Sequence, residues 1–161
     1  MDPPRLADSA ISSLINGVIN GAISWSAFKT SASVPLFMDG IGSPGITALG
    51  NAATVVFALT LIITCITFFV FRRSARKSSV APAALRSMPF VPTGLRIAAL
   101  NTLLVFGAFV AAAVLRQRFV GTVSVSPLVA TLVVAFMAMA ATVFAELRTK
   151  REMLAAGAAT R

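Results

Sequence analysis

The chain has 161 residues, of which 57% are hydrophobic and 12% charged, and its formal net charge is +9. Soluble domains are about 45–50% apolar and about 25% charged, so this chain carries too few charges to cover a surface that faces water. Its mean hydropathy of +0.89 also excludes a disordered chain, which requires low hydrophobicity. The composition therefore indicates an integral membrane protein.

Four apolar stretches are long enough to cross a bilayer, because about 20 helical residues span its core of about 30 Å. In chain order they cover residues 11–28, 46–71, 97–115 and 128–145. None of them alternates between apolar and polar residues, as the strands of a membrane barrel do. We therefore expect an all-α fold, in which a single domain forms a bundle of four transmembrane helices.

The first stretch is the least apolar of the four, and it is the one that a cleaved signal peptide would occupy. A signal peptide begins with positive charge, whereas Asp2 and Asp8 offset Arg5 ahead of this stretch. Asn16 and Asn20 are also unusual in the apolar part of a signal peptide. The sequence therefore predicts a first span that stays in the protein.

The positive charges indicate how the spans are oriented. Eleven of the 14 lysine and arginine residues lie in the N-terminal segment, the loop 72–96 and the tail 146–161. Because cytoplasmic loops are enriched in these residues, we expect both termini and the middle loop in the cytoplasm, with the spans in a bacterial inner membrane. Lys29, Arg116 and Arg118 lie on the other side, and Arg116 and Arg118 fit this orientation least well.

Two loops contain apolar residues that should not face water. The outer loop 29–45 includes Val34 and Leu36, and it is expected either to lie on the membrane surface or to fold back over the bundle. In the middle loop, the segment 85–91 combines Arg86 with apolar residues, which favours contact with the membrane interface.

A cluster of cations opens the middle loop. It consists of Arg72, Arg73, Arg76 and Lys77. Cations at the cytoplasmic end of a span hold the topology and contact anionic lipid head groups. Because no aromatic residues are interleaved with them and no recognition motif is present, we expect membrane lipids and no nucleic acid as partners.

The first stretch has a pattern at four-residue spacing, which places its members on one helix face. The polar stripe contains Ser12, Asn16, Asn20 and Ser24, and beside it run Ser13, Gly17 and Gly21. An amide that faces lipid is unsatisfied, so the stripe should face protein or water. Three interpretations remain open, namely packing against the second or third span, contact with another copy, or the lining of a path.

Two asparagines in later spans are candidate partners for this stripe. Asn51 and Asn101 both lie near the start of their spans. Consecutive spans run in opposite directions, so these two residues should lie at opposite membrane depths.

Several kinds of chemistry are excluded by missing residue types. The chain has no histidine and a single cysteine, Cys65, so it cannot assemble a metal, haem or iron–sulfur site by itself, and we expect no cofactor. Charged residues are absent from the middle of every predicted span, which argues against a proton-coupled carrier. Glu146 is expected to pair with Lys150 four residues later. The absence of a catalytic motif predicts that the protein is not an enzyme.

The segment 14–25, with the sequence LINGVINGAISW, resembles the opening of small, uncharacterised bacterial inner-membrane proteins with several spans. The resemblance covers about one span. It implies no activity and assigns no functional residue.

These observations give one leading functional hypothesis and two alternatives. The leading hypothesis is a non-catalytic accessory or scaffold subunit that assembles, as a homo-oligomer or in a larger complex, through the small and polar face of the first helix. The first alternative is an oligomeric channel or facilitator for a neutral or hydrated solute, in which Asn16, Asn20, Asn51 and Asn101 would contact the solute. The second alternative is a protein that binds a lipid-like molecule between its helices.

Overall fold

The computed structural model describes residues 9–37, 46–78 and 81–158. Almost all of this chain is helical, as the sequence predicts. The four long helices are α1 (Ala10–Phe28), α2 (Ala48–Lys77), α4 (Leu95–Val120) and α5 (Pro127–Ala158). The short elements are α3 (Ala83–Ser87), the π-helical turn η2 (Phe90–Gly94), and the two-residue strands β1 (Val34–Pro35) and β2 (Ser124–Val125).

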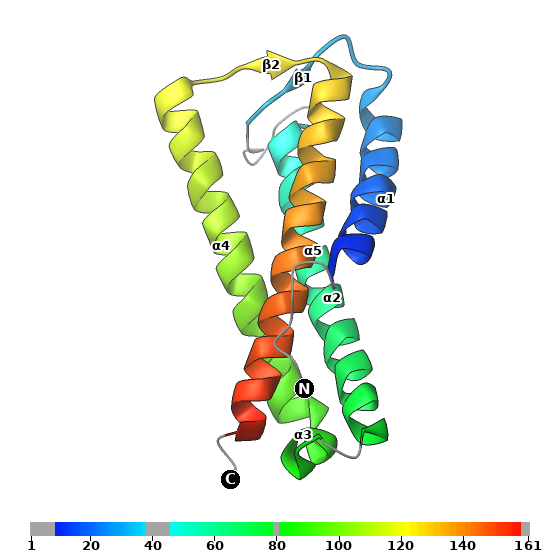
Figure 1. Ribbon diagram of the computed structural model, residues 1–161. Coiled ribbons are helices and arrows are strands. Elements are labelled where there is room, and N and C mark those ends of the chain that lie inside the picture. Colours follow the sequence, from blue (N-terminus) through cyan, green and yellow to red (C-terminus); the bar gives the residue numbers. More distant parts are fainter. Residues whose placement is uncertain (1–8, 38–45, 79–80, 159–161) are drawn as a thin grey trace.

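The four long helices run alternately up and down, and α5 lies at the centre (Figure 1). Contacts are extensive between α1 and α5, between α2 and α5, and between α2 and α4. They are sparse between α4 and α5, which diverge toward the end of the bundle that carries β1 and β2 (Figure 1). Helix α1 runs beside the half of α5 that is nearer this end.

Three helices in the described part of the chain are long and apolar enough to cross a membrane. They are α2, α4 together with η2, and α5. Helix α1 is outside this set because Asn16, Asn20 and its serines lower its hydropathy. Its 19 residues would still extend about 28 Å, close to the thickness of a bilayer core.

Local signals in the sequence explain where the helices begin and end. At the start of α2, the hydroxyl of Thr47 accepts a hydrogen bond from the Gly50 amide at 3.1 Å and caps the helix. Helix α4 ends at Gly121, whose φ of 76° is accessible mainly to glycine. Helix α5 begins with Pro127 at its first position, where proline costs no backbone hydrogen bond.

The region 72–96 is more ordered than the loop that the sequence suggests. Helix α2 continues to Lys77, and α3 and η2 fill most of the remainder. Arg86 on α3 donates to the Ala81 carbonyl, while Arg76 Nε donates to the Arg86 carbonyl at 3.0 Å. These bonds tie the chain reversal to the end of α2.

The segment 85–91 is partly packed into the bundle, while Val91 remains 69% exposed, and its contact with the membrane interface stays a prediction. Leu85 and Met88 are buried in an apolar cluster with Phe68, Ile97 and Met153. This packing is possible because α2, α4 and α5 all extend beyond the end of α1, and the reversal closes over their ends. We call the cluster of Phe68, Leu85, Met88, Ile97 and Met153 the end cluster.

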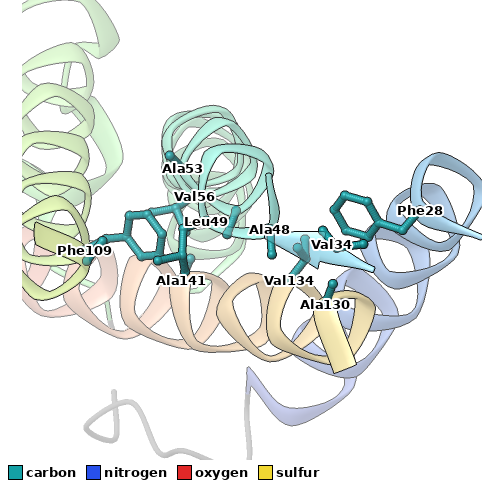
Figure 2. Packing of buried hydrophobic residues seen from close by; sticks show 12 residues of the cluster. Phe28, Val34, Ala48, Leu49, Ala53, Val56, Phe109, Ala130, Val134 and Ala141 are labelled. Atoms are coloured by element: carbon teal, nitrogen blue, oxygen red, sulfur yellow. The ribbon is translucent and has the colours of Figure 1, made fainter. Parts of the chain in front are cut away.

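A larger apolar cluster fills the half of the bundle near β1 and β2, and side chains from α1, β1, α2, α4 and α5 meet there (Figure 2). Val34 of β1 is only 1% exposed within it, so this part of the outer loop folds back over the bundle, whereas residues 38–45 of the loop lie outside the described residues. The guanidinium of Arg116 donates to the Leu36 carbonyl and holds β1 in place. This contact gives a structural reason for a cation on the side where the sequence predicts few.

Close approach of α1 to α5 depends on glycine. A Cβ at Gly17 would lie 2.5 Å from Met139 Cγ, and one at Gly21 would lie 3.2 Å from Ala135 Cβ. Small residues allow helix backbones to approach in this way. Gly17 and Gly21 therefore form the contact surface of α1 with α5.

We predict that Gly17→Ile and Gly21→Ile each lower the free energy of unfolding by about 1–3 kcal/mol, because the larger side chains push α1 away from α5. The measurement is reversible unfolding in mixed micelles. Gly107→Ile is the matched control, since a Cβ there would meet no described atom within 4 Å. Equal losses for the control and the two α1 variants would contradict the assigned contact.

Candidate functional site

The polar stripe of α1 is only partly the face that the helix buries. Ser24 at the end of the stripe is buried, together with Phe28 and with Ser13, Gly17 and Gly21, which lie one position beyond the other stripe residues. Asn16 and Asn20 are half-buried beside them, and Asn20 Nδ2 donates to the Asn16 backbone carbonyl at 2.8 Å. The side-chain amide of Asn20 thus satisfies part of its hydrogen bonding within α1 itself.

The partner of α1 differs from the one that we expected. The sequence suggested the second or third span, whereas α1 packs mainly on α5, the fourth. Ala135 and Met139 of α5 face the two glycines. The reason is geometric, because the alanine and threonine residues of α5 leave room for a second backbone.

Each end of the stripe is fixed by a side-chain hydrogen bond to another helix. The Ser12 hydroxyl donates to Oε1 of Glu146 on α5. Oε2 of Glu146 lies 3.8 Å from Lys150 Nζ, which confirms the expected pair. At the other end, Asn51 Nδ2 of α2 donates to Ser24 Oγ at 3.0 Å. These hydrogen bonds give the two ends of the stripe a structural role, because they hold α1 to α5 and to α2.

We predict a coupling free energy of about 0.6 kcal/mol between Ser24 and Asn51, the average for polar contacts between membrane helices. It is measured as the non-additivity of Ser24→Ala and Asn51→Ala in a double-mutant cycle of unfolding free energies. Strictly additive losses would show that this hydrogen bond does not hold α1 to α2.

Asn101 lies in a separate polar layer, far along the bundle from Asn51. Its Nδ2 donates to Thr64 Oγ1 of α2 at 3.3 Å and to Thr149 Oγ1 of α5 at 3.1 Å. Thr149 in turn donates to the Ala145 carbonyl at 2.5 Å. The layer joins α2, α4 and α5 between the two apolar clusters. The stripe on α1 and Asn101 therefore belong to different sites.

A pocket of about 250 Å³ opens beside this layer, between the start of α4 and the end of α5. Its polar lining is formed by Thr93, Arg96, Asn101, Arg148 and Glu152. Asn101 is 1% exposed, yet its Oδ1 has no hydrogen-bond partner among the described residues. Nε of Arg148 is likewise buried and lacks a hydrogen-bond partner in the part of the chain that the structure describes. We call this site the basic pocket.

An apolar groove of about 530 Å³ continues along α4 and α5 toward the β1–β2 end. Leu104 and Phe109 line it from α4, and Met137 and Phe144 line it from α5. The two cavities are neighbours along the helices, because the guanidinium of Arg148, which lines the basic pocket, lies 5.8 Å from the centre of the Phe144 ring, which lines the groove. We call the basic pocket and the groove together the seam; it is cationic at one end and apolar along the rest.

The cluster at the end of α2 was our expected contact with anionic lipid. Arg73, Arg76 and Lys77 are exposed and Arg72 is half-buried, so the cluster is open to head groups. Arg76 is also engaged by the Arg86 carbonyl. Arg5 and Arg161, which we counted among the cytoplasmic cations, lie outside the described residues.

The sequence did not single out the cations of the basic pocket. Arg96 and Arg148 lie 52 positions apart in the chain, and only the fold brings them together. The four-residue spacing of Phe144 and Arg148 was an available signal for their contact on α5. Comparison with protein-family profiles, with curated proteins and with solved structures finds no match to this chain. The seam is therefore the feature of this chain from which a function can be inferred.

Proposed function

We propose that the protein is a non-catalytic inner-membrane protein with four spans and cytoplasmic termini, and that it binds a membrane lipid between α4 and α5. The seam is the observation that carries this proposal, because its cationic end and apolar length match the two parts of a phospholipid. The basic pocket contributes Arg96 and Arg148, and the groove contributes apolar side chains from both helices.

The fourth span in this proposal is α1. Ile11, Leu14, Val18 and Ile23 are between 58% and 76% exposed on its outer face. An apolar surface of this kind is unfavourable in water and ordinary in lipid. Antiparallel packing against α5 supports the same assignment, because it places α1 beside a helix that is long and apolar enough to cross the membrane.

The orientation can be tested with single cysteines in a Cys65→Ala background. Ala10, Ser31 and Ala155 are exposed sites at the two ends of α1 and near the end of α5. We predict that Ser31→Cys reacts with an impermeant maleimide in intact spheroplasts, whereas Ala10→Cys and Ala155→Cys react only after permeabilisation. Labelling of Ala10→Cys and Ser31→Cys from the same side would contradict a spanning α1.

The other two hypotheses receive less support from the geometry. Assembly through Gly17 and Gly21 would require α1 to leave α5, since α5 fills that surface. A solute path would need the polar side chains to share a line of access. Asn51 instead binds Ser24, while Asn101 binds Thr64 and Thr149 at another level.

The lipid hypothesis can be tested by filling the groove. Ala112 lines the groove, whereas the neighbouring Ala111, which is also exposed, does not. We predict that Ala112→Phe reduces the lipid that co-purifies with the protein by about fivefold, because a ring occupies the space of the acyl chain. Ala111→Phe, the same change one residue away, should retain the wild-type amount.

Native mass spectrometry of protein released gently from its membranes measures both the bound lipid and the oligomeric state. Equal lipid retention by the two phenylalanine variants would contradict binding in the groove. A stoichiometric companion polypeptide in place of lipid would instead favour the accessory-subunit hypothesis.

A further inference from the structure

We propose that the basic pocket selects an anionic phospholipid whose head group carries a free hydroxyl, as phosphatidylglycerol does. This inference rests on the proposed function and assigns its ligand class. Selection has to come from the head group, because an acyl chain gains little on moving from apolar lipid into an apolar groove. Basic pockets between helices on the cytoplasmic side of a membrane are suited to anionic head groups.

The phosphate is assigned to the two arginines of the basic pocket. Arg96 approaches from the first turn of α4, and Arg148 approaches from α5. Nη2 of Arg148 lies 3.6 Å from Oε1 of Glu152, so this carboxylate already engages one edge of the guanidinium. Nε, which shares an edge of the guanidinium with Nη2, is buried and has no hydrogen-bond partner among the described residues. Because the guanidinium has five N–H donors in a planar fork, it can hold Glu152 and a phosphate oxygen together.

The hydroxyl is assigned to Asn101. Both of its described hydrogen bonds leave from Nδ2, so Oδ1 remains as a buried acceptor without a described partner, in a residue that lines the pocket. A buried carbonyl oxygen without a donor costs free energy. A phosphodiester offers only acceptor oxygens and cannot satisfy it, whereas a hydroxyl on the head group can donate to it.

An ammonium head group also carries donors, but the charge of the pocket disfavours it. Arg96 and Arg148 outnumber the single carboxylate of Glu152. A zwitterionic head group would bring its ammonium toward this net positive charge. The pocket therefore favours a head group that carries both a negative charge and a neutral hydrogen-bond donor.

The experiment compares lipids that share the same acyl chains and differ only in their head groups. Purified protein in mixed micelles is titrated with phosphatidylglycerol, phosphatidylmethanol, phosphatidylethanolamine or phosphatidylcholine, and the bound lipid is counted by native mass spectrometry. Phosphatidylmethanol has the charge of phosphatidylglycerol and lacks the hydroxyl. We expect phosphatidylglycerol to bind about fivefold more tightly than phosphatidylmethanol, the value of one hydrogen bond. The two zwitterionic lipids should bind more weakly than either.

Three variants locate the effect. Arg96→Gln should weaken binding of phosphatidylglycerol by about fivefold or more. Arg118→Gln makes the same charge change at an exposed cation near the other end of α4 and should leave binding unchanged. Asn101→Leu should abolish the preference for phosphatidylglycerol over phosphatidylmethanol. If Asn101→Leu fails to fold, the two arginine variants and the wild-type lipid series still decide the question.

The outcomes separate this inference from the function on which it rests. Equal binding of all four lipids, with Ala112→Phe still defective, would overturn the head-group assignment and leave lipid binding in place. Failure to retain any lipid would overturn the proposed function. Equal weakening by Arg118→Gln and Arg96→Gln would attribute binding to general surface charge. Displacement of phosphatidylglycerol by an equal concentration of glycerol 1-phosphate would indicate a soluble ligand and contradict the proposal.

Discussion

The arrangement of this bundle depends on how closely other helices can approach α5. The residues that α5 buries are mostly alanine and threonine, and Ala130, Ala138 and Ala145 are completely covered. Short side chains let α1 and α2 pack directly against its backbone, as small residues do between membrane helices. Helix α4 instead rests mainly on α2. The seam between α4 and α5 follows from this difference, because the closest contacts of α5 are made to α1 and α2.

The bundle is longer than a membrane core is thick, and this explains its two apolar clusters. Helix α5 has 32 residues, or about 48 Å of helix against a core of about 30 Å. Helices α2, α4 and α5 extend beyond α1 at the end that carries α3 and the end cluster (Figure 1). The layer of Asn101, Thr64 and Thr149 separates the two clusters. The basic pocket opens beside this layer, next to the apolar groove.

The candidate site was only partly predictable. The sequence indicated Asn101 as a candidate site residue, because an amide within an apolar stretch needs a hydrogen-bond partner. Its partners were not evident, since threonines in helices commonly satisfy themselves on the preceding turn. Arg96 and Arg148 each looked like an ordinary cation at the end of a span. Arg96 and Arg148 line the same pocket because α4 crosses α5, and no local sequence pattern encodes this crossing. The cluster at Arg72 was easier to notice because its members are adjacent in the chain.

Hydropathy and charge placement determined, by themselves, that this is a helical membrane protein whose cations gather near one end of the bundle. Those properties belong to each segment separately, and so they can be deduced without knowing which segments touch. The tertiary structure decided that α1 packs on α5, that β1 folds over the bundle, and that Leu85 and Met88 are buried. It also decided that Asn101 and two arginines line one pocket. These outcomes depend on the fit between surfaces distant in the chain, where the position of a glycine or alanine sets how near two backbones can lie.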